Sequence, residues 1–117
     1  MSIATLPGWR CLAESVAGTS HLAHQLPCQD AHKILALGDK HLVLAVADGA
    51  GSAKHAEQGA KIAVDISTEF VSCHLSELVP QDQASCENIL RQAFIHTRTA
   101  IEQAHAEIQS SSRQLFL

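Results

Sequence analysis

The segment Leu42–Ala47 is an unbroken apolar run, and it constrains the fold more than any other feature of the chain. Its lack of alternation predicts a β-strand that is buried on both faces. The residues Gly38–Lys40 before it predict a hairpin turn, because Gly and Asp tolerate the backbone angles that such turns need. We therefore expect Ala31–Leu37 to form the neighbouring antiparallel strand. The partly alternating segment Trp9–Ala17 predicts an earlier strand that stops at Gly18.

Two long amphipathic helices are expected after this hairpin. The first should begin near Ser52, whose hydroxyl can cap a helix N-terminus, and Pro80 should end it. Its apolar stripe is expected to comprise Ala56, Ala60, Ala63, Ser67, Phe70 and His74, and Ile62, Ile66 and Val71 are expected to widen it. The second should begin near Ser85, with a stripe of Ile89/Leu90, Ala93/Phe94, Thr97, Ala100/Ile101, Ala104 and Ile108.

After the second helix, a further strand is expected to begin at Gln114–Leu117. The order of the earlier elements predicts the fold class. Strands followed by two amphipathic helices indicate an α+β fold, with the helices packed against an antiparallel sheet.

The composition and charge argue against two classes of binding partner. Of the 117 residues, 46% are hydrophobic, and the net charge is −4. Such a chain is expected to fold as one domain or part of one. We expect it to bind neither nucleic acid nor a membrane, because it carries no basic surplus and no apolar run of spanning length. The N-terminal residues 1–4 lack the basic and apolar regions of a secretory signal, so we expect a cytoplasmic protein.

Cysteine and histidine leave a zinc site as an open alternative. In a cytoplasmic protein the cysteines are expected to be reduced thiols rather than a disulfide framework. A zinc-binding array could be assembled from His21, His24, Cys28 and His32, whose side chains are of the right kind. The array lacks the C-x-x-C pairs of structural zinc sites, and we rank this alternative last.

The segment Val46–Ala53, V-A-D-G-A-G-S-A, is compatible with two interpretations, because D-G-x-G is a common turn and can also form part of an oxygen-ligand metal site. Asp48 ends the apolar strand, and its carboxylate is a ligand that Mg²⁺ and Mn²⁺ prefer. Gly49 has no side chain, so its backbone carbonyl can approach an ion closely. Asp30 precedes the neighbouring strand. Because a hairpin returns the chain to its starting end, we expect Asp30 and Asp48 to lie side by side.

Together these segments resemble a known family. G-T-S-H at 18–21, C-Q-D-A at 28–31 and V-A-D-G-A-G-S-A at 46–53, followed by A-E-x-G-A at 56–60, resemble the start of the PPM family. These are the metal-dependent protein serine/threonine phosphatases, also called protein phosphatase 2C, and the likeness is to bacterial members. The resemblance spans about residues 9–108.

The resemblance implies two antiparallel sheets packed face to face, with helices outside, and two Mn²⁺ or Mg²⁺ ions between the sheets. In the family, the residue matching Asp48 bridges both metals, the carbonyl matching Gly49 binds one, and the residue matching Asp30 helps to hold that ion. It also implies hydrolysis of phosphoprotein phosphomonoesters by a metal-bridging hydroxide, since two cations activate water and stabilise developing charge.

The chain also departs from the family pattern. Gln25 stands where many members carry a phosphate-binding Arg, and Ala50 where some carry a His. His55 lies outside the motif, and an exposed helix residue is expected there. No catalytic residue is therefore predicted beyond the metal ligands, and the phosphate-binding group is unknown.

The G-D and D-N motifs that supply further metal-binding Asp residues in the family do not follow position 53. Residues 1–117 are thus expected to be a partial phosphatase domain without its C-terminal half. We expect little or no activity alone, because two carboxylates compensate two cations poorly. The alternative hypothesis is a non-catalytic interaction or regulatory module. In either case an uncovered sheet would favour self-association.

Overall fold

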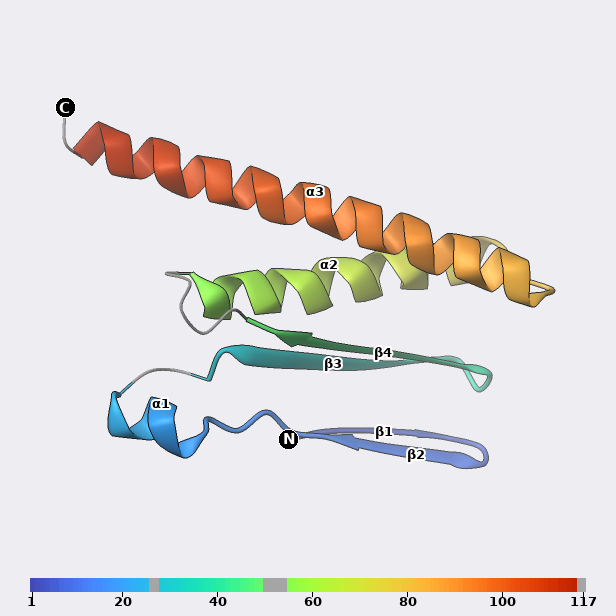
Figure 1. Ribbon diagram of the computed structural model, residues 1–117. Coiled ribbons are helices and arrows are strands. Elements are labelled where there is room, and N and C mark those ends of the chain that lie inside the picture. Colours follow the sequence, from blue (N-terminus) through green and yellow to red (C-terminus); the bar gives the residue numbers. More distant parts are fainter. Residues whose placement is uncertain (26–27, 50–54, 116–117) are drawn as a thin grey trace.

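The computed structural model describes residues 1–25, 28–49 and 55–115 and confirms the α+β class. Two small antiparallel sheets lie one above the other, and two long helices follow on one side of them (Figure 1). The elements are β1 (Ser2–Leu6), β2 (Trp9–Ala13), α1 (Thr19–Ala23), β3 (Asp30–Leu37), β4 (His41–Asp48), α2 (Ala56–Glu77) and α3 (Gln83–Leu115).

The β1–β2 hairpin contains a strand that was not predicted. Leu6 pairs with Trp9, so Pro7 and Gly8 form a two-residue turn, and Gly8 has a φ of 81°. Pro followed by a residue of positive φ is the pattern of a type II turn, and this dipeptide could have revealed β1. The predicted strand to Ala17 is too long, because β2 ends at Ala13.

The β3–β4 hairpin follows the prediction in its turn and pairing, but not in its burial. Leu37 pairs with His41 across a turn in which Gly38 has a φ of 59°. Helix α2 packs on one face of both strands. On the other face of β4, Leu44 is 57% exposed and Val46 is 85% exposed. Burial on both faces was therefore a wrong prediction, because the β1–β2 sheet packs against β3 rather than β4.

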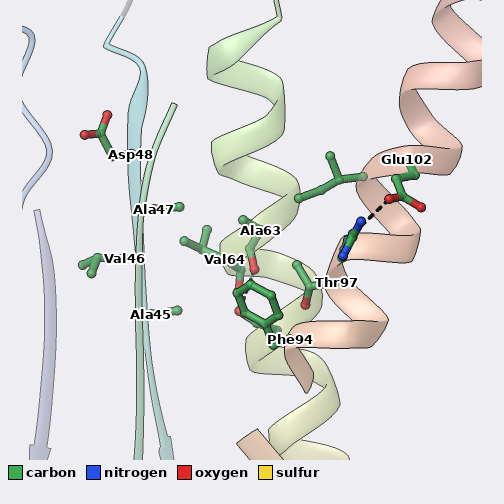
Figure 2. Close-up of a pocket in the computed structure, with 12 residues that line it drawn as sticks. Ala45, Val46, Ala47, Asp48, Ala63, Val64, Phe94, Thr97 and Glu102 are labelled. Carbon is green, nitrogen blue, oxygen red and sulfur yellow. Dashed lines mark hydrogen bonds and ion pairs between the residues drawn. The ribbon is translucent and has the colours of Figure 1, made fainter. Parts of the chain in front are cut away.

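Helix α2 is packed on two sides, and this changes its buried stripe. Its described part begins at Ala56, while the predicted cap Ser52 lies outside the described residues. Figure 2 shows Ala63 and Val64 between β4 and helix α3. Because the helix contacts a sheet and another helix, no single stripe describes it, and its buried residues are Ala56, Ala60, Val64, Thr68 and Val71. Four members of the predicted stripe (Ala63, Ser67, Phe70 and His74) are only half-buried.

Helix α3 is longer than predicted at both ends. Asp82 precedes it and accepts a hydrogen bond from the backbone N–H of Ser85 at 2.7 Å, as a capping residue does. The helix continues to Leu115, so the strand predicted from Gln114 is wrong where the structure describes it. An established helix extends at little cost through residues such as Gln, Arg and Leu. None of the described helices combines the length and hydropathy that a bilayer crossing requires.

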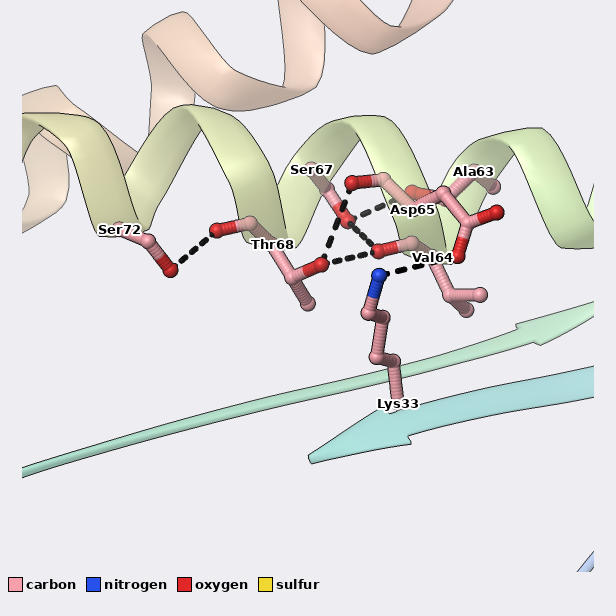
Figure 3. A network of polar contacts seen from close by, with 7 residues as sticks. All are labelled: Lys33, Ala63, Val64, Asp65, Ser67, Thr68 and Ser72. Atoms are coloured by element: carbon pink, nitrogen blue, oxygen red, sulfur yellow. Dashed lines mark hydrogen bonds and ion pairs between the residues drawn. The ribbon is translucent and has the colours of Figure 1, made fainter. Parts of the chain in front are cut away.

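Polar side chains of α2 form hydrogen bonds with backbone carbonyls of the same helix or an ion pair with strand β3 (Figure 3). The hydroxyl of Thr68, which is 1% exposed, donates to the carbonyl of Val64 at 2.7 Å. The ammonium of Lys33 on β3 lies 3.3 Å from the carboxylate of Asp65. A buried hydroxyl that donates a hydrogen bond to a carbonyl one turn earlier in its helix keeps a polar partner. Its burial therefore does not carry the free-energy cost of an unpaired hydroxyl. The network therefore lets α2 lie flat on the sheet despite its Ser and Thr content.

Candidate metal centre

The two predicted carboxylates lie opposite each other at one end of the β3–β4 hairpin. The register pairs Asp30 with Asp48 directly, and both side chains are exposed. Figure 2 shows Asp48 and Val46 on the side of β4 that faces away from α2. Side chains of directly opposed residues share one face of a sheet. The juxtaposition predicted from the hairpin is therefore present, on the face toward the β1–β2 sheet.

The electrostatics of this pair favour a cation. A hydrogen bond with Asp48 raises the pKa of the Asp30 carboxyl above its usual value, and partial loss of hydration and the negative charge of Asp48 add to this increase. The neighbouring His21 acts in the opposite direction on the same pKa. When two carboxylates repel each other, a nearby positive charge lowers their pKa values and favours the ionised form of both. A cation placed between the two carboxyl groups would therefore lower the electrostatic cost of ionising Asp30 beside Asp48.

Gly49 is held tightly between two backbone segments. Its N–H donates to the carbonyl of Gln29 at 3.0 Å. A Cβ at this position would lie 2.5 Å from the carbonyl oxygen of Ala56 and 2.7 Å from that of Gln29. No φ in the left-handed region is involved, so the requirement for glycine is a matter of space alone. The close packing fixes the chain directly after Asp48.

A cleft of about 760 Å³ opens beside the carboxylates, between the two hairpins. Its walls come from the end of β2 and the following loop, and from β3 and β4. His32 crosses this region: its Nε2 lies 3.0 Å from the hydroxyl of Ser2, and its Nδ1 lies 2.6 Å from that of Ser15. These bonds join the β1–β2 sheet to β3 and so hold one wall of the cleft in place.

The donor set fits one hard divalent cation. Carboxylates and a backbone carbonyl are the ligands that Mg²⁺ and Mn²⁺ take, and Asp30, Asp48 and Gly49 supply both kinds. The described residues bring together no group of three or more His, Cys, Asp or Glu side chains that could hold a metal. A pair of ions would need more carboxylates than this part of the chain offers.

Other predicted candidates lie elsewhere. Gln25, at the position of the phosphate-binding Arg, is exposed with a φ of 55°. His55 is exposed just before α2, beside Gly59 and His105 rather than in the cleft. Ala50 falls outside the described residues.

The zinc alternative finds no support in the described geometry. His32 is engaged by two serines, as above, and Nδ1 of His24 lies 2.8 Å from the carbonyl of Ser20. All four cysteines, namely Cys11, Cys28, Cys73 and Cys86, are free thiols.

Sequence reasoning missed two residues beside the carboxylates. His32 was considered only as a zinc ligand, although its position opposite Val46 places it on the cleft face. Gln29 is buried, and its Oε1 has no hydrogen-bond partner among the described residues. The alternation of β3 after Asp30 would have predicted the position of His32. No pattern in the sequence marks Gln29 as buried.

Comparison with known proteins agrees with the motifs and the fold. The family model for protein phosphatase 2C matches residues 17–115. A stretch of 68 residues is 43% identical to serine/threonine-protein phosphatase 3 of Escherichia coli (strain K12), covering 55% of this chain and 27% of that protein. The chain therefore spans much less than half the length of this relative. No solved structure is significantly similar. Because the family match includes both carboxylates and both long helices, the chain belongs to the protein phosphatase 2C family.

Proposed function

We propose that the chain is part of a metal-dependent protein serine/threonine phosphatase. The observation that carries this proposal is the pairing of Asp30 with Asp48 at one end of a hairpin, in a chain that matches the protein phosphatase 2C family. The E. coli relative is named as a serine/threonine-protein phosphatase, which supports phosphoserine and phosphothreonine side chains of proteins as the substrate class. The reaction is hydrolysis of a phosphomonoester.

Each residue has a separate part in the proposed site. Asp48 and Asp30 hold Mn²⁺ or Mg²⁺ through their carboxylates, and Gly49 contributes its carbonyl. When bound, such ions supply a water of lowered pKa and stabilise negative charge on phosphate. The tight packing of Gly49 keeps the carbonyl close to Asp48. The bonds of His32 to Ser2 and Ser15 hold the β1–β2 side of the cleft next to the carboxylates.

Residues 1–117 are proposed to be a partial phosphatase domain with little or no activity of its own. The described residues gather two carboxylates, which neutralise one divalent ion but not two. A site that lacks charge and ligands binds hard cations weakly. The chain is therefore expected to bind a single Mn²⁺ ion weakly rather than the pair expected from the family.

Calorimetric titration with Mn²⁺ tests the metal site directly. We expect one weak site in the unmodified chain and its loss in Asp48→Asn. The matched control is Asp39→Asn, which removes the same charge from the turn at the opposite end of the hairpin and should leave binding unchanged. Equal binding in the chain and in Asp48→Asn would contradict the assignment of Asp48.

Hydrolysis of p-nitrophenyl phosphate with millimolar Mn²⁺ tests the expected lack of activity. We expect a rate close to the blank for the 117-residue chain. A rate well above the blank that Asp48→Ala abolishes would show that the chain is a complete enzyme and would refute the partial-domain proposal.

An interaction module is the second candidate, and one observation favours it. Leu44 and Val46 leave an apolar strip on the sheet face toward the cleft, and such strips promote association. Sedimentation velocity should then show concentration-dependent oligomers that Val46→Thr reduces. A monomer at all concentrations would argue against this candidate.

A further inference from the structure

A small cavity of about 80 Å³ lies between α2 and α3, at the end where α2 begins. Figure 1 shows the two helices side by side and running in opposite directions, so the C-terminal half of α3 lies beside the start of α2. Each helix presents one face to the cavity, because its lining residues are three or four positions apart. These residues include His55, Gln58 and Gly59 at the start of α2, and Ala104, His105 and Ile108 of α3.

A histidine stands on each wall of this cavity. His55 directly precedes α2, and His105 lies on α3. In the part of the chain that the structure describes, neither ring takes part in a hydrogen bond, whereas the rings of His24, His32 and His74 each do. A neutral imidazole has one nitrogen with a lone pair that can bind a metal. Both walls of the cavity therefore offer a nitrogen ligand that is not engaged elsewhere in the described structure.

Gly59 leaves room for an ion between these walls. It lies one helical turn after His55, and a Cβ at this position would meet no atom within 4 Å. The open space beside it is therefore not filled by a side chain of its own. A cavity of about 80 Å³ is large enough for a metal ion with bound water. The apolar side chains of Ile62 and Ile108 complete the lining.

The ligand chemistry of this cavity differs from that of the carboxylate pair. Imidazole nitrogens suit Zn²⁺, Cu²⁺ and Ni²⁺, whereas Mg²⁺ and Mn²⁺ prefer oxygen ligands. The described residues add no third His, Cys, Asp or Glu here, so the amide oxygen of Gln58 and water would complete a tetrahedral shell around Zn²⁺. The dipole of α2 is positive at this end and opposes a cation. The affinity is therefore expected to be weaker than that of a structural zinc site.

We propose that His55 and His105 together bind one Zn²⁺ ion, which joins the start of α2 to α3. The residue after His55 is Ala56, whose carbonyl oxygen would lie 2.5 Å from a Cβ at Gly49. The bound ion would therefore hold in place the helix turn that packs against the carboxylate end of the hairpin. This site does not depend on the binding of Mn²⁺ or Mg²⁺ at Asp48, and either proposal can fail without the other.

The experiment titrates Zn²⁺ into the 117-residue chain and follows the histidine ring signals by NMR and the midpoint of urea denaturation. We expect the ring signals of His55 and His105 to shift at lower Zn²⁺ concentrations than those of the other histidines. Zn²⁺ should also raise the urea midpoint, because a ligand that binds only the folded chain stabilises it. Loss of an outer-shell partner alone lowers metal affinity about tenfold or more. His55→Gln and His105→Gln each remove a ligand, so each should weaken binding by at least about tenfold.

His24→Gln is the matched control, since it removes an exposed imidazole at the end of α1. It should leave Zn²⁺ binding unchanged, and circular dichroism should show that all variants are folded, because all three positions are exposed. The proposal is overturned if either of the two ring signals stays in place at saturating Zn²⁺, or if both single variants keep the affinity of the unmodified chain. It is also overturned if His24→Gln abolishes binding, because the ion would then lie elsewhere.

Discussion

Replacing Gly49 with Ala should destabilise the fold around the carboxylate pair. The added Cβ would lie 2.5 Å from the carbonyl oxygen of Ala56, 2.7 Å from that of Gln29 and 2.8 Å from the carbonyl carbon of Ala56. All three are backbone atoms, so no flexible side chain can move aside. The hairpin end must separate from the start of α2, and the 3.0 Å hydrogen bond from Gly49 to Gln29 would be strained or lost.

The size of the effect follows from these contacts. Overpacking of this kind costs about 1–3 kcal/mol, and loss of a backbone hydrogen bond adds about 1 kcal/mol. We therefore expect the free energy of unfolding to fall by about 2–4 kcal/mol. At a urea slope of about 2 kcal/mol per M, which is within the range for small domains, the midpoint should fall by about 1–2 M.

Urea denaturation followed by circular dichroism measures this change, and Gly59→Ala is the matched control. A Cβ at Gly59, within α2, meets no atom within 4 Å, and Ala is a better helix former than Gly by about 1 kcal/mol. The control should therefore be as stable as the unmodified chain or more stable. If Gly49→Ala also kept its midpoint, the packing described for the turn after Asp48 would be incorrect.

Three further predictions concern the sheet and its contact with α2. The raised pKa of Asp30 in the folded chain means that the native state binds more protons than the unfolded state, so the unfolding free energy should fall as pH rises from 3.8 through the raised value. Thermal melts across this range should show the fall in the unmodified chain and its near absence in Asp48→Asn. Lys33→Ala removes a half-exposed ion pair with Asp65, and urea denaturation should show a loss below about 1 kcal/mol that shrinks further in high salt. Val64→Ala removes two methyl groups from a side chain that is 3% exposed and packs under the sheet. It should lower the free energy of unfolding by about 2 kcal/mol in the same assay, and a smaller loss than for Lys33→Ala would contradict the described packing.

Local patterns predicted the parts of the fold that depend on neighbouring residues. The turn at Gly38–Lys40 and the return of Asp48 to Asp30 follow from turn chemistry and from the geometry of a hairpin, and both are present. The strand β1 was missed because Ser2–Leu6 has little alternation of its own. It exists because Pro7 and Gly8 form a turn that pairs it with β2.

Burial was the property that local patterns predicted least well. The unbroken apolar run Leu42–Ala47 could not show that the β1–β2 sheet covers β3 and leaves Leu44 and Val46 exposed. The stripe on α2 shifted to include Val64 and Thr68 because a second helix contacts the same turns as the sheet. Burial depends on which helices and strands pack against each other, and these contacts join residues that are far apart in the sequence.

The amino-acid sequence by itself determined the α+β class, the hairpin that pairs Asp30 with Asp48, and the resemblance to metal-dependent phosphatases. These rest on short-range rules, since turns, strand ends and motif spacing are set within a few residues. Only the tertiary structure decided that Gly49 is enclosed by two carbonyls and that His32 joins the two sheets. It alone also decided that β4, α2 and α3 enclose cavities of about 480 and 370 Å³. Packing between distant segments creates such spaces and contacts, and no local pattern contains them.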